Sequence, residues 1–107
     1  MGRVTLTGSG LTLDELLAVA RDGAQVEIDP AALAAMGRAR AVVERAIADG
    51  NPTYAVTTGV GSRKSFDIEA SDHDRLLVRQ HRISQGVPVA HEIVRATALR
   101  LANALAR

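Results

Sequence analysis

The sequence lacks cysteine and tryptophan, and its only phenyl or phenol rings belong to Tyr54 and Phe66. Without cysteine, disulfide bonds, thiolate nucleophiles and zinc–thiolate centres are excluded. With so few aromatic side chains, the core has to consist of leucine, valine, isoleucine and much alanine. Because alanine buries little surface, at about 25 cal/mol per Å², we expect modest stabilisation per helix and a benefit from a partner surface.

An excess of charge of one sign is also missing. The chain has 13 basic and 12 acidic residues among 107, so nothing draws it as a whole to nucleic acid or to an anionic membrane. It has no apolar run of roughly 18 residues and no signal-peptide pattern at its start. Composition and length therefore predict one soluble, cytoplasmic domain with no nucleic-acid or membrane partner.

Two local patterns predict the first elements. Thr12 and Glu15 have the spacing of a capping box, which predicts a helix over residues 13–21 that Gly23 ends. Val26 and Ile28 alternate with polar residues, which predicts a short strand that pairs with residues 3–6.

Three further helices are expected. Asp29-Pro30 is a typical helix start, and Gly50 ends that helix. Residues 71–74 can begin a third helix, which residues 86–88 break. A fourth begins at about Ala90 and stays helical to the last residue, as either a fraying natural end or a chain cut from something longer. The predicted fold is mainly α, with a short two-stranded β element and a glycine-rich loop.

That loop, residues 53–65, reads TYAVTTGVGSRKS. It allows a phosphate cradle, a plain turn or a catalytic loop. A Walker loop needs glycine directly before its lysine, but Arg63 precedes Lys64, and a dinucleotide loop needs a third glycine after Gly59 and Gly61. From the pattern alone, Tyr54 is best interpreted as a ring packed after the Asn51-Pro52 turn.

Histidines and arginines give no site by themselves. His73 and His91 lie at predicted helix starts, where solvated residues are expected, and His81 reads as an ordinary half-buried histidine. No metal site is predicted. The arginines of the last two helices alternate with acids and lack stacking aromatics, which favours a solvated or inter-subunit face over RNA binding.

Residues 54–61 resemble the Y-G-[VI]-[NT]-T-G-F-G signature of the aromatic amino acid lyases, above all histidine ammonia-lyase. Flanking segments resemble the family in the same order: L-T-L-x-x-L at 11–16, V-E-[LI]-[DP] at 26–29, R-x-x-V-E-R-A-[IV] at 40–47, L-V-x-x-H at 77–81, G-x-P at 86–88 and A-N-x-L-[AS]-R at 102–107. The resemblance covers nearly the whole chain, which is identified as an N-terminal lyase-like domain over residues 1–107.

The resemblance implies elimination of ammonia from an aromatic L-amino acid, or migration of the amine in aminomutases. The implied electrophile is a 4-methylideneimidazol-5-one ring that forms from an Ala-Ser-Gly triad, and Tyr54 is implied as the base. A free phenol is protonated at neutral pH, so such a base depends on donors that stabilise its phenolate. We expect the glycines to let main-chain N–H groups approach the phenol and the loop to close over substrate.

Other site residues follow from the same resemblance. Gly61, Gln80 and His81 are implied to bind substrate, with Thr58 and Gly59 as loop residues. The chain departs from the family at Ala55 (glycine), Val60 (phenylalanine) and Ser84 (glycine), which leaves histidine, tyrosine and phenylalanine open as substrates.

An Ala-Ser-Gly triad does not occur in the sequence, since residues 8–10 are Gly-Ser-Gly and residues 70–72 are Ala-Ser-Asp. The family's downstream helical bundle is absent as well. We therefore expect an inactive piece that needs the remainder of the lyase polypeptide, or a complementary chain, in a homo-oligomer that is a tetramer in relatives. Two alternatives stay open: a non-catalytic helical interaction module, and a small phosphate- or RNA-binding domain that uses Arg63 and Lys64.

Overall fold

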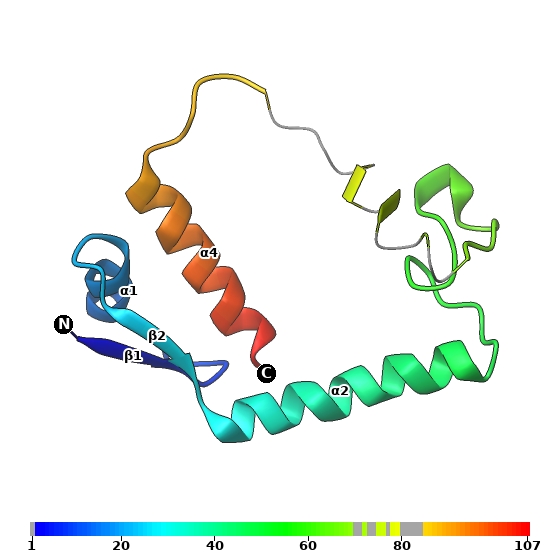
Figure 1. The fold of residues 1–107 in the computed structure, drawn as a ribbon, viewed down its shortest axis with the longest axis horizontal. Helices are drawn as coiled ribbons and strands as arrows, with labels where there is room; N and C mark the ends of the chain where they lie inside the picture. The colour runs from blue at the N-terminus through cyan, green and yellow to red at the C-terminus, as the bar shows by residue number, and fades with distance from the viewer. Residues whose placement is uncertain (1, 70–71, 73–74, 77, 80–84) are drawn as a thin grey trace. The chain divides into compact units, whose positions relative to one another are not determined.

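The computed structural model describes residues 2–69, 72, 75–76, 78–79 and 85–107 (Figure 1). The chain divides into two compact units. Unit 1 consists of Met1–Ala39 and Val87–Arg107, and unit 2 is Arg40–Gly86. Helices dominate the described residues, and two short strands pair in unit 1, so the predicted fold class is confirmed.

Unit 1 opens with a β–α–β arrangement of β1 (Arg3–Leu6), α1 (Leu13–Ala20) and β2 (Gln25–Ile28). The strands are parallel and in register from Arg3 opposite Gln25 to Leu6 opposite Ile28. Helix α1 begins with the predicted capping box, in which the Glu15 amide donates to Thr12 Oγ1 at 3.3 Å and the Thr12 amide donates to Glu15 Oε2 at 2.9 Å. The local signals thus placed the first three elements correctly.

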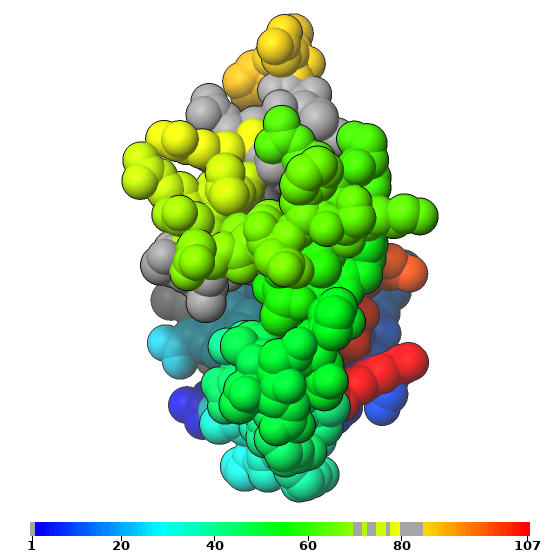
Figure 2. Space-filling model, turned by 90° about the vertical axis from the view of Figure 1, so that its right-hand side faces the viewer, coloured from blue at the N-terminus to red at the C-terminus, as the bar shows by residue number. Residues whose placement is uncertain are grey.

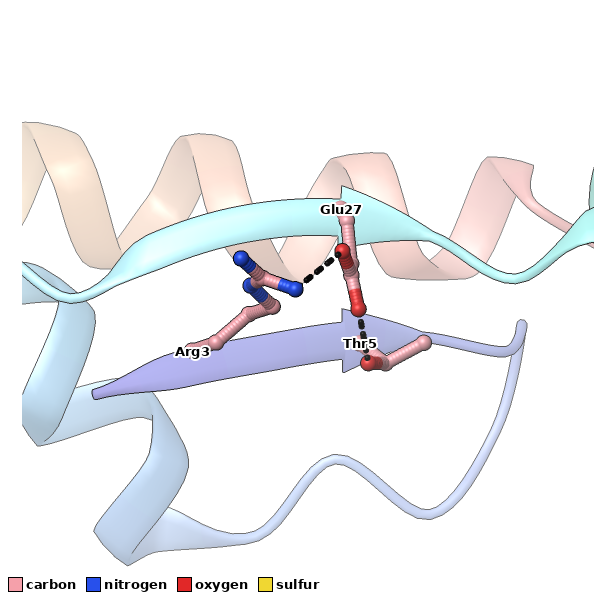
Figure 3. A network of polar contacts seen from close by, with 3 residues as sticks. All are labelled: Arg3, Thr5 and Glu27. Atoms are coloured by element: carbon pink, nitrogen blue, oxygen red, sulfur yellow. Dashed lines mark hydrogen bonds and ion pairs between the residues drawn. The ribbon is translucent and has the colours of Figure 1, made fainter.

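On its outer face the strand pair carries a small polar network (Figure 3). Thr5 Oγ1 donates to Glu27 Oε1 at 3.1 Å, and Arg3 Nη1 lies 3.4 Å from Glu27 Oε2. Since the charged side chains are about half exposed or more, water screens their attraction and the pair adds little stability. The inner face contributes more to stability, because Val4 and Leu6 alternate with these polar residues and are buried.

A small apolar core lies in unit 1 between β1, α1 and α4 (His91–Leu105). Leu6, 2% exposed, is its largest fully buried side chain. The other members are Val4, Val19, Ala24 and Leu99, with Leu11 and Ala18 packed against them. The expected core of small aliphatic side chains is therefore what the structure contains.

Polar contacts tie α4 to α1. Arg95 Nη2 donates to the Val19 carbonyl at 2.7 Å, and Arg21 Nε donates to Glu92 Oε2 at 2.8 Å. The first contact is partly buried and also supplies a donor to a carbonyl near the end of α1, where helix carbonyls lack partners. Figure 1 shows α4, in orange to red, running beside α1 and the strands.

The prediction that the last helix continues to residue 107 was wrong by two residues. Helix α4 ends at Leu105, and Ala106, its C-cap, is 1% exposed. The Gly8 amide donates to Asn103 Oδ1 at 3.1 Å, and Arg107 Nε donates to the Gly8 carbonyl at 3.0 Å. Helix geometry stops here because the backbone turns to bury Ala106 against the Gly8 loop.

Helix α2 (Pro30–Ala48) begins and ends where its sequence signals predict. Asp29 Oδ1 accepts the amides of Ala31 and Ala32 at 2.8 and 3.2 Å. At the other end the Gly50 amide donates to Ile47 and the Asn51 amide to Ala46, with Gly50 at a φ of 68°, which is the Schellman arrangement. Its only buried residue is Ala32, and Figure 2 shows its cyan-to-green side chains open to the viewer.

Within the predicted third helix, five described residues are helical, namely Asp72, Arg75, Leu76, Val78 and Arg79, whereas Gln85, directly before the expected break, is not. The expected break is present at Gly86, whose φ of 128° is a backbone conformation that favours glycine. In the part of the chain that the structure describes, no helix is both long and apolar enough to cross a membrane.

Candidate active site

The glycine loop of unit 2 begins with a tight turn that carries Tyr54. The amides of Val56 and Thr57 both donate to the Thr53 carbonyl, at 3.0 and 2.9 Å. Ala55 completes the turn with a φ of 60°. Two main-chain hydrogen bonds to one carbonyl thus hold the residues on either side of the tyrosine.

Tyr54 itself is exposed, at 61% of its surface, but its oxygen has a main-chain partner. The Gly61 amide donates to Tyr54 Oη at 3.1 Å. The expected approach of a main-chain N–H to the phenol is therefore present in the structure. The rest of the ring is exposed, so a molecule from outside the chain can reach it.

A positive φ of 58° at Gly61 aims this amide back at the tyrosine, and the residue opens the short 3-10 helix Gly61–Arg63. An L-residue with a side chain adopts this conformation at a cost of roughly 1–2 kcal/mol. Gly61 is therefore suited to donate to the phenol because of its backbone conformation.

Gly59 serves the loop by close packing. A Cβ atom built on it would lie 2.6 Å from the Arg63 carbonyl oxygen, closer than any real contact of that kind. Its amide donates to the Phe66 carbonyl at 3.0 Å. Glycine is therefore required here for steric reasons, and its amide donates to Phe66 and not to the phenol.

Next to it, Thr58 is the buried polar residue of the loop, 5% exposed. Its hydroxyl donates to the Gly59 carbonyl at 3.0 Å, and its backbone forms an antiparallel bridge with Asp67. The Ile68 amide donates to the Thr57 carbonyl at 3.1 Å. Main-chain hydrogen bonds between residues 57–59 and residues 66–68 therefore join these two segments and close the loop.

Ala55 occupies the left-handed region where the family signature has glycine. The methyl group makes this conformation unfavourable by roughly 1–2 kcal/mol relative to glycine. The structure keeps the turn in spite of that cost, so the turn is held by its other contacts.

Thr57 provides several of those contacts, although it was not among the residues predicted for the site. The Thr53 amide donates to Thr57 Oγ1 at 2.8 Å, and this hydroxyl lies within donating distance of the Asn51 carbonyl, at 3.4 Å. Threonine at the end of a turn often bonds to the backbone in this way. A threonine four residues after another threonine, following Asn-Pro, is the signal that would indicate it.

The amides of the loop have little left for a phosphate. Those of Gly59 and Gly61 donate to Phe66 and Tyr54, and those of Arg63 and Lys64 donate to the carbonyls of Val60 and Gly61. A phosphate cradle needs such groups free to converge on one anion. The structure therefore disfavours the phosphate-cradle interpretation.

Two of the predicted substrate-binding residues, Gln80 and His81, lie outside the described residues, as does His73. Their assignments stay predictions. His91 begins α4 and is exposed, as expected for a helix start.

Hollows are also present among the described residues of each unit, and Tyr54 lines neither of the following two. In unit 2 a hollow of about 370 Å³ is bounded by Gly59, Arg63, Phe66, Asp67, Ile68 and Leu76. In unit 1 one of about 450 Å³ lies between the residues 8–13 and the end of α4. The candidate site is thus an exposed phenol on a loop that main-chain hydrogen bonds close.

Comparison with known proteins agrees with the loop signature. The family model of the aromatic amino acid lyases matches residues 11–107. Histidine ammonia-lyase of Koribacter versatilis (strain Ellin345) is 39% identical over 110 residues, covering 100% of this chain and 21% of that enzyme. Histidine ammonia-lyase of Symbiobacterium thermophilum (strain DSM 24528 / JCM 14929 / IAM 14863 / T) is 40% identical over 103 residues, covering 94% of this chain and 20% of that enzyme.

Two solved structures superpose on this chain over nearly its whole length. The ergothioneine-degrading enzyme ergothionase from Treponema denticola matches with a TM-score of 0.90 and 28% identity, over 97% of this chain and 22% of that one. Tyrosine aminomutase from Streptomyces globisporus matches with a TM-score of 0.87 and 28% identity, over 97% and 20%. The chain spans about a fifth of the length of the curated relatives it matches. It belongs to the aromatic amino acid lyase family.

Proposed function

We propose that this chain supplies the base-bearing loop of an ammonia-lyase that acts on histidine or another aromatic amino acid, with Tyr54 as the general base. The observation that carries the proposal is the Gly61 amide on Tyr54 Oη, at 3.1 Å, on a loop with the family's signature. A phenol oxygen that faces a main-chain donor and is otherwise exposed is suited to hold negative charge and to meet a substrate proton.

In the proposed reaction the Tyr54 oxygen takes a proton from the substrate's β-carbon. The electron pair of that C–H bond forms the Cα–Cβ double bond, and the amine leaves with the pair of the C–N bond, giving ammonia and an α,β-unsaturated acid. Before the transfer the Gly61 amide stabilises the phenolate, and after it the phenol stays hydrogen-bonded to the same amide. Removal of such a base typically costs 10²- to 10⁴-fold in rate.

The family implies a 4-methylideneimidazol-5-one group, which supplies the electrophile that makes the amine a leaving group. The residues of this chain do not fit its formation, since the sequence holds no Ala-Ser-Gly triad. They do fit a position facing it, because Tyr54 is exposed. We propose that another stretch of polypeptide, in the same protein or in a complementary chain, contributes the group and the rest of the substrate cavity, within a homo-oligomer.

The test uses the complete enzyme, meaning this chain together with the polypeptide that carries the Ala-Ser-Gly segment. Tyr54→Phe should lower turnover by at least about 10²-fold while circular dichroism stays unchanged. Thr97→Val is the control, because it removes an exposed hydroxyl from α4 that donates to Ile93. Near-normal turnover in Tyr54→Phe would show that Tyr54 is not the base.

A second measurement concerns the chain alone. Incubated with histidine, tyrosine or phenylalanine, it should give no rise in ultraviolet absorbance from urocanate or a cinnamate. Steady turnover by the pure chain would contradict the proposal that the electrophile comes from elsewhere. If the complete enzyme instead moves the amine to the β-carbon, as in the tyrosine aminomutase that the chain resembles, the same base assignment would serve an aminomutase.

A further inference from the structure

The loop contains a hydroxyl that has no role in the proposed chemistry yet makes more contacts than any other side chain in the turn. Thr57 Oγ1 accepts the Thr53 amide at 2.8 Å and lies 3.4 Å from the Asn51 carbonyl and 3.5 Å from the Thr53 carbonyl. This one hydroxyl thus lies within hydrogen-bonding distance of the main chain of both Asn51 and Thr53, which lead into the turn.

We infer that Thr57 is a positioning residue that holds Tyr54 in place for catalysis, an inference that rests on the proposed function. Tyr54 follows Thr53 directly, so fixing the Thr53 amide fixes the backbone from which the phenol projects. The Gly61 amide holds the far end of the same side chain at its oxygen. Tyr54 is therefore held at both ends by residues that follow it in the loop.

Main-chain hydrogen bonds of Thr57 connect the turn around Tyr54 to the rest of the loop. Its amide donates to the Thr53 carbonyl at 2.9 Å, and its carbonyl accepts the Ile68 amide at 3.1 Å. Thr57 therefore belongs both to the turn that carries the phenol and to the paired segments that close the loop. The Gly59–Phe66 and Ile68–Thr57 hydrogen bonds involve main-chain atoms only, so a substitution of the Thr57 side chain leaves their donor and acceptor atoms in place.

The turn depends on these hydrogen bonds because one of its residues has an unfavourable backbone conformation. Ala55 has a φ of 60°, which an alanine adopts unfavourably. Packing supplies little compensation, because Tyr54 is exposed and its turn contains no buried residue. The hydroxyl of Thr57 is partly buried, where a hydrogen bond is worth about 1 kcal/mol, which corresponds to roughly a fivefold change in an equilibrium.

The test compares Thr57→Val, which keeps the shape and removes the hydroxyl, with Thr57→Ser, which keeps the hydroxyl. Tyr54 is the only tyrosine and there is no tryptophan, so tyrosine fluorescence anisotropy reports the motion of this ring alone. In the 107-residue chain, Thr57→Val should lower the anisotropy and speed hydrogen exchange of the Thr53 amide by about fivefold. Thr57→Ser should resemble the parent, as should the distant control Thr97→Val.

In the complete enzyme, Thr57→Val should lower kcat by about fivefold or more with KM unchanged, and Thr57→Ser should restore it. A role in folding alone would not separate kcat from KM in this way. Unchanged anisotropy and kcat in Thr57→Val, or a serine variant as poor as the valine variant, would overturn the inference. If the valine variant does not fold, Thr57→Ala against Thr57→Ser makes the same comparison.

The outcome for Thr57 can be told apart from that for the proposed function. If Tyr54→Phe keeps full activity, Tyr54 is not the base, whatever Thr57 does to the anisotropy. If Tyr54→Phe abolishes activity and Thr57→Val changes neither anisotropy nor kcat, the base assignment stands and the positioning role of Thr57 is wrong.

Discussion

A buried apolar cluster holds unit 1 together, whereas hydrogen bonds of the main chain and of threonine hydroxyls hold the loop of unit 2. In unit 1 the strands, α1 and α4 share a buried apolar cluster that includes Val4, Leu6 and Leu99. In unit 2 the buried described residues are Thr58 and Gly59, and bonds such as Gly59 to Phe66 close the loop. Parts of a protein with few buried contacts open locally more easily. The proposed base therefore stands where small changes in backbone geometry affect function more than overall stability.

The largest expected effect lies in the core of unit 1. Leu6→Ala should lower the free energy of unfolding by about 2–5 kcal/mol, because it removes buried methyl groups and leaves a cavity. Urea unfolding followed by circular dichroism measures this. Leu101→Ala, at a side chain that is 59% exposed, should change stability by about 0.5 kcal/mol or less. Equal effects of the two variants would show that the buried cluster does not stabilise unit 1.

Two glycines of unit 1, one closely packed and one open, give the next effect. In Gly8→Ala the new methyl group would lie 2.7 Å from the Ala106 carbonyl oxygen, at a φ of 88°, so we expect a loss of about 2 kcal/mol. Gly37→Ala, inside α2 with no atom near its Cβ position, should instead add about 1 kcal/mol. The midpoints of urea unfolding measure the change in stability of both variants. The same sign in both variants would contradict the close approach of Gly8 to the end of α4.

In the loop, Ala55→Gly should stabilise the turn by about 1 kcal/mol, because glycine adopts a positive φ without steric cost. Hydrogen exchange of the Thr57 amide, which donates to Thr53, should slow accordingly, and the global unfolding midpoint should hardly move. Ala34→Gly in α2 is the matched control and should cost about 1 kcal/mol. Faster exchange at Thr57 in Ala55→Gly would contradict the strain at Ala55.

The smallest effect concerns pH. The Thr12 amide and then the Thr12 hydroxyl donate to Glu15 and hold the pKa of that carboxyl below its usual value. The stability that Glu15 contributes is therefore present above the unfolded-state pKa, about 4.3, and is lost as pH falls through the lower folded-state pKa. Glu15→Gln keeps an acceptor for the Thr12 amide but does not titrate. The change in urea midpoint between neutral and acidic pH should be smaller in Glu15→Gln than in the parent, and an equal change would contradict the capping contact.

Elements with a local chemical cause were predictable. The capping box at Thr12, the Asp29 cap and the stop at Gly50 each depend on residues within one turn, and the structure has all three. The end of α4 was not predictable, because Ala106 is buried by contacts with the Gly8 loop, far away in sequence. The order of residue types along the chain does not show which residues far apart in sequence will be in contact.

The same limit applies to the candidate site. The signature pointed to Tyr54 and to an amide near its ring, and the Gly61 amide lies there. The steric role of Gly59 depends on its separation from the Arg63 carbonyl, and the role of Thr57 depends on a turn that brings it back to Thr53. Neither separation can be read from the spacing of residue types. Gln80 and His81 stay predictions.

Unit 1 is assembled from the two ends of the chain, with unit 2 inserted between them. The Gly8 amide on Asn103, the Arg95 side chain on the Val19 carbonyl and the Arg21–Glu92 pair all join the leading segment to the trailing one. A backbone cut after Gly50 would therefore leave two peptides with complementary surfaces, which should reassociate as a split protein does. By the same reasoning, unit 1 should keep its fold when a relative's sequence replaces the tyrosine loop.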